Sequence, residues 1–372
     1  MASIRTKRLS NGKPAYLVRF RAVDGKERSK QFSRRRDAEH FAHVTEVDRM
    51  QGSFVDPRLG KLTVADWYEQ WWPTVTNLRP STRARNEDAM RNHVLPAFAT
   101  VPLARVDRTS LREWVARMAD PDQGGLAPAT VAKNVQVFNK LMRAAVEDRL
   151  IPANPVERLP LPRIETEEMR FLTPAELTKL ADTIDPRYRA FVILAGYSGL
   201  RLGELLALRW SSIDARRRQI QVSETLSAVK GQISFGPPKT RAAIRAVGVP
   251  GFVIEELLSA GGPADAPTDL VFVSPEGQPV RPTLFRRRFW NPAVNAAGLA
   301  PLRIHDLRHT AVAFWIAAGA HPKQIAARAG HTSVSVVLDR YGHLLPNHED
   351  AFMQALEALG ASAAAPPNVE SS

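Results

Sequence analysis

Cysteine is absent from this chain of 372 residues, which excludes disulfide bonds and cysteine-bound zinc. Long apolar runs are absent as well, because no stretch is long enough to cross a bilayer and no secretory signal is recognisable. Neither absence limits the size of the hydrophobic cores, since 44% of the residues are hydrophobic. We therefore expect a folded cytoplasmic protein that has no membrane partner.

Acidic residues are too few to balance the basic ones. The chain holds 51 Lys and Arg against 38 Asp and Glu, a formal net charge of +13. The excess is concentrated in residues 1–36, where twelve Lys and Arg face only Asp24 and Glu27. A charge run is often only a solvated face, but so uneven an excess favours a polyanionic partner. Nucleic acid fits better than a membrane surface, because no strongly amphipathic basic helix accompanies the charge.

The first 55 residues, called the head below, have the pattern of a small β-β-β-α domain. Tyr16, Val18 and Phe20 alternate with basic residues, and Asp24-Gly25 is typical of a hairpin turn. A helix is expected to follow an N-cap at Ser33. The side chains available to pack that helix are Phe41, Val44 and Val47.

The sheet of the head carries basic residues along its strands. Such a sheet could lie in a DNA groove, as other β-sheet readers do, or it could simply be solvated. The second reading stays open because the returning strand shows no clearly apolar face, but we favour DNA binding. The residues expected to contact DNA here are Arg19, Arg21, Lys26, Arg28 and Lys30.

A linker with glycine and proline separates the head from a helical segment over residues 62–155. Apolar residues recur at helical intervals there, and we interpret its tryptophans as core rather than as a platform for base stacking. Helices are expected over residues 64–72, 81–94, 110–118 and 128–146. The residues of this segment expected to contact DNA are Arg83, Arg85, Lys133 and Lys140.

Residues 170–360 are expected to form a larger, mostly helical domain with a small antiparallel sheet. A proline-rich connection over 151–170 precedes it, and Thr173, Pro174 and Glu176 combine a capping box with proline in the first turn. The fold class is therefore α+β, with several domains. Helices are expected over 174–183, 187–197, 251–260, 283–296, 306–318, 322–329 and 333–340, and strands within 219–226, 232–239 and 243–250.

The stretch "RIHDLRHTAVAFWIAAGA", which begins at Arg303, is apolar in its second half but polar in its first turn. His305, Arg308 and His309 share one face of the expected helix, at i, i+3 and i+4 spacing. A metal, a structural hydrogen-bond network and a phosphate are the competing explanations. A metal is disfavoured because Arg308 would repel a divalent cation and Asp306 is too short to replace a glutamate. A phosphate suits a bidentate guanidinium beside imidazole donors at a helix start.

Three other fragments carry groups that would suit the same phosphate. "SGLRLGELLALRW" places Arg201 at a helix start, with Glu204 three residues later. "PPKTRAAIRAVGVP" places Lys239 between two strands, and "ARAGHTSVSVVLDRYGHL" places His331 between helices, ten residues before Tyr341. Each fragment is a poor signal by itself, but the ordered set is highly specific.

In order and spacing, Arg201, Lys239, "HDLRHT", "AGH" and "YGH" resemble the tyrosine recombinase (phage integrase) family. The likeness is strong over residues 170–345, which correspond to the family's catalytic domain. The preceding helical segment resembles the family's core-binding domain in place and character. The head resembles the arm-type DNA-binding domain of lambda-type integrases, by pattern only.

The resemblance implies a catalytic role for each matching residue. Arg201 and Arg308 would hold the non-bridging oxygens of the scissile phosphate, where fixed cations neutralise charge in the transition state. Tyr341 would be the nucleophile that forms a 3′-phosphotyrosyl link. A phenol with a pKa of about 10 is a poor nucleophile until such cations favour its phenolate.

The remaining matching residues would assist this step. His305 would take part in proton transfer and phosphate binding, and His331 would donate to the phosphate. Lys239 would protonate the leaving 5′ oxygen, with Lys230 as a less well matched rival. Supporting roles are expected for Glu204, His309 and His343.

The function implied is site-specific DNA recombination by a phage or mobile-element integrase in the cytoplasm of a bacterial host, near its nucleoid. It would act on double-stranded attachment sites as a homotetramer, without a metal or other cofactor. An excision factor and a host DNA-bending protein are further partners to consider. The alternatives are a chromosome-dimer resolvase, a type IB topoisomerase-like strand transferase, and a DNA-binding regulator whose catalytic residues are vestigial.

Overall fold

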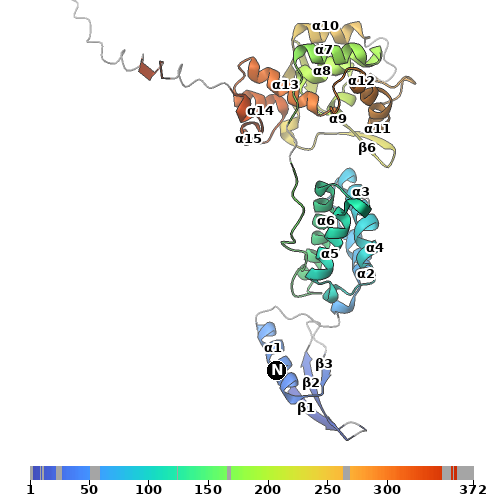
Figure 1. The fold of residues 1–372 in the computed structure, drawn as a ribbon, viewed down its shortest axis with the longest axis vertical. Coiled ribbons are helices and arrows are strands. Elements are labelled where there is room, and N and C mark those ends of the chain that lie inside the picture. Colours follow the sequence, from blue (N-terminus) through green and yellow to red (C-terminus); the bar gives the residue numbers. More distant parts are fainter. Residues whose placement is uncertain are drawn as a thin grey trace, which may run out of the picture. The chain divides into compact units, whose positions relative to one another are not determined.

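The fold is drawn in Figure 1 from a computed structural model of the chain. The chain divides into two compact units, Met1–Thr166 and Glu167–Ser372. Among the described helices, none is long and apolar enough to traverse a membrane. The structure describes residues 3–8, 10, 12–21, 27–50, 59–123, 125–165, 169–262, 269–345, 353–354 and 356–357.

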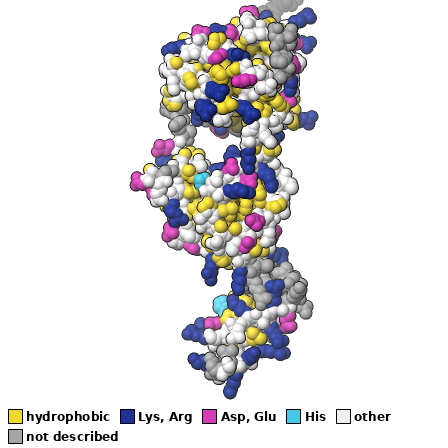
Figure 2. All heavy atoms as spheres, turned by 90° about the vertical axis from the view of Figure 1, so that its right-hand side faces the viewer, with side chains coloured by type: hydrophobic (Ala, Val, Ile, Leu, Met, Phe, Trp, Pro, Cys, Tyr) yellow, Lys and Arg dark blue, Asp and Glu magenta, His cyan; other side chains and the backbone are white. Residues whose placement is uncertain are grey.

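The head has the expected β-β-β-α order. Strands β1 (Ser3–Arg8), β2 (Pro14–Arg21) and β3 (Glu27–Phe32) form an antiparallel sheet in chain order, and helix α1 (Arg35–Met50) packs on it. Lys and Arg side chains stand out from its described part in Figure 2. Lys26 and the side chain of Arg21 lie outside the described residues.

The strand register places two of the predicted DNA contacts on the face of the sheet that α1 covers. Val18 lies opposite Lys30, and Phe20 lies opposite Arg28. Directly opposed residues of an antiparallel pair share a face. Phe20 is buried with its ring 5.6 Å from that of Phe41 on α1, and the Lys30 ammonium lies 4.6 Å from the Phe41 ring. Arg28 and Lys30 therefore point to the same side as the apolar residues.

The opposite face carries different basic residues. Arg19 pairs with Ser3 on one side, and Leu17 pairs with Arg5, so these side chains point away from α1. Lys7 belongs to the same set because it lies two residues after Arg5 on β1. The two groups of cations in the head thus lie on opposite faces of the sheet.

Helix α1 packs through residues other than the expected valines. Val44 and Val47 are 40% and 36% exposed, so the expectation that they pack was wrong. The helix instead buries Ala38 and Thr45 and turns Phe41 towards the sheet. This stripe has the spacing of a helix face, and the two valines fall beside it.

The helical segment is a bundle, and the expected helices are present. The capping box at the start of α2 is formed by Thr63 and Asp66. Trp67 and Trp114 are buried, and the Trp67 indole donates to the carbonyl of Leu141 over 3.1 Å, which confirms their place in the core. The elements, with short 3-10 and π turns labelled η, are η1 (Leu59–Lys61), α2 (Val64–Trp71), η2 (Trp72–Thr74), α3 (Pro80–Ala89), η3 (Met90–Val94), α4 (Leu95–Phe98), η4 (Leu103–Arg105), α5 (Arg108–Ala119), η5 (Pro121–Gln123) and α6 (Pro128–Glu147).

The second unit is mostly helical, as expected, and its helices follow the predicted ranges closely. Its capping box at Thr173 and Glu176 is also present. The helices are α7 (Pro174–Thr183), η6 (Pro186–Tyr188), α8 (Arg189–Ser198), α9 (Leu202–Leu206), η7 (Trp210–Ser212), η8 (Arg241–Ala243), α10 (Gly251–Ser259), α11 (Pro282–Phe285), η10 (Arg286–Trp290), α12 (Asn291–Ala296), α13 (Asp306–Ala317), α14 (Pro322–Ala329), α15 (Ser335–Tyr341) and η11 (Gly342–Leu344).

Within the described residues of this unit, the β-strands form two small antiparallel sheets rather than one. One has three strands in the order β4-β5-β8, and the other is a hairpin of β6 and β7. The hairpin leaves the sheet after β5 and returns before β8, so it is an insertion between two paired strands. The strands are β4 (Ile213–Asp214), β5 (Gln219–Val222), β6 (Thr225–Val229), β7 (Gln232–Gly236) and β8 (Arg245–Gly248).

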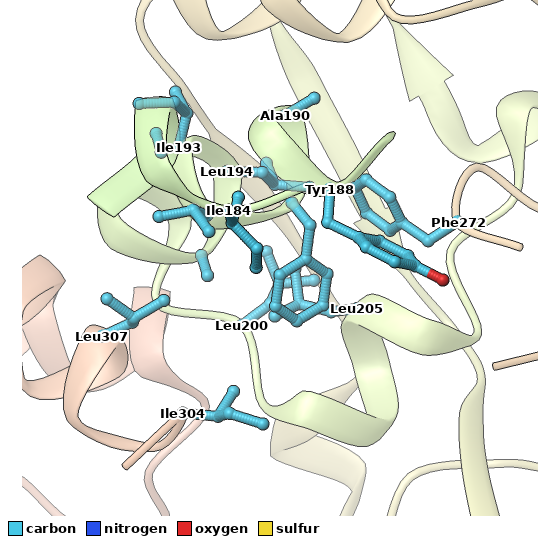
Figure 3. Close-up of a cluster of buried hydrophobic side chains, with 14 of the residues drawn as sticks. Ile184, Tyr188, Ala190, Ile193, Leu194, Leu200, Leu205, Phe272, Ile304 and Leu307 are labelled. Atoms are coloured by element: carbon cyan, nitrogen blue, oxygen red, sulfur yellow. The ribbon is translucent and has the colours of Figure 1, made fainter. Parts of the chain in front are cut away.

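Buried apolar side chains anchor the segments that carry the predicted catalytic residues (Figure 3). Leu200 and Leu307 are 3% and 0% exposed and belong to one large core cluster with Ile304. Each leucine directly precedes a predicted catalytic arginine, so packing fixes the backbone from which the guanidinium projects. A second cluster, which includes Trp315 and Tyr341, joins α13, α14 and α15.

Candidate active site

Arg201 lies at a sharp turn between α8 and α9. Gly199 ends α8 with φ +60, and a Cβ atom there would lie 2.8 Å from the Trp315 ring, so only glycine fits both the conformation and the space. The backbone N–H of Arg201 then donates to a carboxylate oxygen of Glu204 over 2.9 Å at the start of α9. The predicted helix start is therefore confirmed, and Glu204 stabilises it.

Glu204 is buried between two arginines. Its side chain is 3% exposed and pairs with Arg201 Nη1 at 2.9 Å and with Arg245 Nη2 at 3.1 Å. Burial alone would raise the pKa of Glu204, but the charges and hydrogen bonds of the two arginines hold it below its usual value. Glu204 is therefore ionised at neutral pH and orients Arg201.

Arg308 is a buried cation whose hydrogen-bond partners are all neutral. The residue is 3% exposed, and its guanidinium donates to the carbonyls of Gly199, over 2.5 Å, and Ala329. It also donates to His331 Nε2 over 3.0 Å. Burial, followed by repulsion from Arg201, lowers the pKa of Arg308 to about 9. A buried charge held by neutral groups is costly unless an anion compensates it.

His331 follows the left-handed Gly330 that ends α14. Because Nε2 accepts from Arg308, the proton of a neutral ring lies on Nδ1. That Nδ1 atom is buried and has no hydrogen-bond partner among the described residues. Burial and then the charges of Arg308 and Arg201 lower the pKa of His331 to about 4. The ring is therefore neutral at pH 7.

Tyr341 ends α15 with its side chain buried, at 2% exposure. Its hydroxyl lies 2.5 Å from His309 Nδ1. Burial raises the pKa of Tyr341, and the charge of Arg308 partly opposes this increase. Burial, and then His305, lowers the pKa of His309 to about 4. A neutral imidazole thus faces the phenol and is able to exchange a proton with it.

Two of the other predicted residues, His305 and His343, lie at the edge of this cluster. The His305 ring stands perpendicular to that of His309, with 5.0 Å between centroids. His343 is exposed beside Phe171, with 6.4 Å between ring centroids. Lys239 is exposed between β7 and β8 and takes part in none of the hydrogen bonds described above.

The two lysines that compete for one role lie at different places in the segment between β5 and β8. Lys230 and Gly231 form its tip, with φ values of +47 and +80 that are typical of a tight hairpin turn. Lys239 follows the hairpin instead, on the exposed segment that leads back to β8. Its position between two strands is as expected, although it does not occupy a hairpin tip.

Three predicted DNA contacts of the bundle gather on α3 and α6. Burial, and then the charges of Arg85 and Lys140, lower the pKa of Lys133, which places these cations close together. Arg83 differs from them because its guanidinium stacks 4.6 Å from the Trp72 ring and donates to the carbonyl of Val75 over 2.5 Å. Arg83 thus already serves the packing of the bundle.

Sequence reasoning missed Arg245, whose side chain is only 7% exposed. The signal was present in the alternation of β8, because Arg245 shares a face with the buried Val247 and Val249. A charged residue at a core position needs a buried partner of opposite charge. Glu204, 41 residues earlier, is that partner, and only the fold could reveal it.

The arrangement concentrates positive charge at one point. Arg201, Arg245 and Arg308 contribute +3 and Glu204 contributes −1, so the cluster retains +2. Such a site fits a phosphodiester, whose charge increases when a nucleophile adds. Among the described residues, no group of His, Asp and Glu side chains is placed to hold a metal ion.

Comparison with protein families agrees with the residue pattern. The sequence model described as the phage integrase family matches residues 170–348. A second model, described as the N-terminal SAM-like domain of phage integrases, matches residues 63–119. Both matches coincide with elements of the structure, the first with the second unit and the second with α2 to α5.

Individual relatives cover most of the chain. The ICEBs1 integrase of Bacillus subtilis is 27% identical over 76% of this chain and 78% of its own length. The integrase of Mycobacterium phage L5 is 27% identical, with 78% of each chain covered.

Solved structures share the fold. The integrase of the Tn1549 transposon, in complex with transposon right end DNA, aligns with a TM-score of 0.67 at 21% identity over 80% of this chain and 99% of its own. A lambda integrase tetramer bound to a Holliday junction aligns with a TM-score of 0.58 at 18% identity over 89% and 93%.

Proposed function

Because the chain belongs to the phage integrase family of tyrosine recombinases, we propose that its Tyr341 attacks a DNA phosphate held by Arg201 and Arg308. The protein is a site-specific DNA recombinase. What we add is the assignment of its chemistry to these residues of this chain, and of DNA contacts to its basic surfaces.

The single observation that supports this assignment best is the environment of Arg308. The Arg308 guanidinium is 3% exposed and donates hydrogen bonds to neutral groups. Its positive charge is therefore not compensated by these partners, and an anion would stabilise it. Arg201 lies beside it, and Glu204 balances only part of the charge. A phosphate oxygen is the ligand that two convergent guanidiniums bind best.

The reaction would proceed by in-line displacement at phosphorus. The Tyr341 oxygen forms a bond to phosphorus as the bond to the 5′ oxygen breaks, and the phenol proton passes to His309, its present partner. Lys239 supplies the proton that the leaving 5′ oxygen needs. The 3′-phosphotyrosyl bond retains the energy of the broken linkage, so a second 5′ hydroxyl can reverse the step and join a different strand.

Tyr341 must reach the phosphate for this step to occur. Its hydroxyl is buried, and α15 is held by the apolar cluster around Trp315. We therefore propose that α15 shifts when DNA binds and brings the Tyr341 hydroxyl to the phosphate, where its proton is released as the bond to phosphorus forms. Cleavage would then depend on correct DNA engagement.

The DNA contacts are assigned by charge and position. In the bundle, Arg85, Lys133 and Lys140 form one basic cluster, which suits the phosphate backbone. The head would bind separate sites with its sheet, and the chain would act as a tetramer on two duplexes. An excision factor and a DNA-bending protein of the host would set the direction of recombination. The three-domain division into residues 1–55, 62–155 and 170–360 is part of this proposal.

Covalent trapping of DNA tests the nucleophile. Wild-type chain and the Tyr341→Phe variant are incubated with a pool of random-sequence duplexes nicked in one strand, so that the short fragment released by cleavage diffuses away. Denaturing gels then separate covalent adducts from free DNA. We expect adducts with the wild type only, and peptide mapping by mass spectrometry should place the DNA on Tyr341.

Tyr197→Phe is the matched control, because this tyrosine lies in the same unit and its ring packs against Phe252 and Phe314 rather than against the predicted catalytic residues. It should form adducts at the wild-type rate. An undiminished yield from Tyr341→Phe, or a wild-type chain that binds the pool without forming any adduct, would contradict the proposal.

A further inference from the structure

The C-terminal end of α14 is the point at which the arginines of the site meet. The carbonyls of residues 328–330 each accept a hydrogen bond from a different guanidinium. The donors, in the order of these carbonyls, are Arg245 Nε at 2.6 Å, Arg308 Nη2, and Arg201 Nη2 at 3.1 Å. The last carbonyls of a helix have no partners within it and carry its negative dipole end, so they suit cations.

Arg245 makes the most complete set of contacts among these arginines. Its Nε holds the end of α14, Nη1 donates to the carbonyl of Ala243 over 2.9 Å, and Nη2 pairs with Glu204 at 3.1 Å. The planar fork thus connects β8, α9 and α14. A lysine could satisfy only part of this pattern.

Gly330 gives this fork its space. Its φ is +64, and a Cβ atom there would lie 3.2 Å from Arg245 Nη1. The same glycine supplies the carbonyl that Arg201 binds, and His331 follows it directly. The position of Arg245 therefore constrains the backbone that carries His331 and that accepts hydrogen bonds from Arg201 and Arg308.

Arg245 also changes the charge available to a phosphate. Glu204 orients Arg201 through both the backbone and the guanidinium. Without a second cation, that carboxylate would compensate most of the charge of Arg201. Arg245 pairs with the same carboxylate, so Glu204 can orient Arg201 while the cluster keeps its net charge of +2.

We propose that Arg245 is a positioning residue of the recombination reaction. It holds Glu204 and the end of α14 so that Arg201, Arg308 and His331 converge on the phosphate with two uncompensated positive charges. This inference rests on the proposed function of the same site. Arg245 itself does not touch the DNA.

The test compares two linkages in one nicked duplex, whose sequence is the one recovered from the random pool with the wild-type chain. In one version the cleaved linkage is a phosphodiester, and in the other it is an uncharged methylphosphonate. Arg245→Met should slow adduct formation about 100-fold on the phosphodiester, because the cations are both misplaced and partly compensated. On the methylphosphonate the loss should shrink to about tenfold or less, because less charge has to be neutralised.

A second variant separates charge from packing. Glu204→Gln combined with Arg245→Met leaves Arg201 and Arg308 with their two charges, so it should recover about tenfold of the rate that Arg245→Met loses. Arg245→Lys keeps the positive charge but lacks the planar fork of the guanidinium. If Arg245→Met does not fold, the adduct rates on the two linkages are compared for Arg245→Lys instead. Arg189→Met is the control, since Arg189 pairs with Asp182 and Glu256 away from the site.

DNA affinity, measured by gel shift, should stay within about twofold of wild type for every variant that folds, since Arg245 acts through other residues. Equal fold losses on the two linkages would overturn the proposal and reduce Arg245 to a structural role. Cleavage at the wild-type rate by Arg245→Met would also overturn it. A wild-type chain that forms no adduct would instead contradict the proposed function, so the two failures are distinguishable.

Discussion

The head and the second unit both carry an excess of positive charge, but they place it in opposite environments. In the head, Arg5 and Lys7 are exposed on β1, and the exposed Arg35 pairs with Glu39, four residues later on α1. In the second unit, Arg308 is 3% exposed and the Arg245 side chain is 7% exposed.

We associate the exposed cations with affinity for DNA and the buried cations with the chemical step. Exposed cations attract DNA at long range, are screened by salt, and tolerate small changes in position. Buried cations are held by carbonyls at fixed distances and act in a medium of low dielectric, where each interaction is stronger and less tolerant. We therefore propose that the same residue type contributes DNA binding in one region and catalysis in the other.

The largest effect is expected at Arg308. Arg308→Lys keeps the charge but cannot reach two carbonyls and His331 at once, so adduct formation should fall about 1,000-fold, or about 4 kcal/mol in transition-state free energy. Single-turnover adduct rates on the nicked duplex measure this. Arg189→Lys should change the rate little, and a rate near wild type for Arg308→Lys would remove the contrast between the two regions.

A smaller effect is expected from pH. His309 and His331 are neutral in the folded chain, where burial lowers the pKa of each to about 4, whereas in the unfolded chain they protonate below about 6.5. The unfolded state therefore takes up protons first as the pH falls. Stability contributed by each histidine is present above pH 6.5 and is lost between about 6.5 and 4, by up to about 3 kcal/mol.

Urea unfolding at pH 7, 5.5 and 4.5 measures this loss. His331→Gln should flatten the dependence of unfolding free energy on pH relative to wild type. His343→Gln replaces an exposed histidine of the same unit and should leave the dependence unchanged. Parallel curves for wild type and His331→Gln would mean that the His331 ring is not held neutral by burial.

The smallest effect per residue is expected in the head. A chain with Arg5→Gln, Lys7→Gln and Arg19→Gln loses three cations on the face of the sheet opposite α1. If each contacts one phosphate, the slope of log affinity against log salt should become shallower by about 2.7. Measurements of affinity for duplex DNA between about 50 and 200 mM salt give the slope.

The matched control for the head changes the other face. Arg28→Gln with Lys30→Gln removes two cations from the side that α1 covers, and we expect a smaller change in slope. A larger change from this pair would show that the helix side of the sheet meets DNA. Deletion of residues 1–58 should reduce the slope further than either variant, and an unchanged slope would mean that the head does not touch DNA.

Much of the secondary structure could be predicted because its signals are local. Thr173 caps the helix at which it was expected, and α13 begins at Asp306 as its polar first turn indicated. The faces of the head could not be assigned in the same way. Arg28 and Lys30 share one face of β3 because of the period of two, but whether that face meets α1 depends on the register with β2.

The candidate site was predictable only as a set of motifs. Arg201, Arg308, His331 and Tyr341 were identified from order and spacing, whereas the burial of Tyr341 against His309 was not. Lys239 illustrates the reverse case, since its motif is clear but its place after the hairpin is exposed. Such contacts join residues far apart in the chain, and no local pattern specifies them.

The sequence by itself determined which residue types are available and where each helix can begin, because caps, periodicity and charge act over a few neighbouring positions. Only the tertiary structure decided that Arg201, Arg245 and Arg308 meet at one end of α14. The physical reason is that a buried cation is stable only where acceptors from distant segments, either carbonyls or a carboxylate, take its hydrogen bonds. That condition depends on the packing of the whole unit.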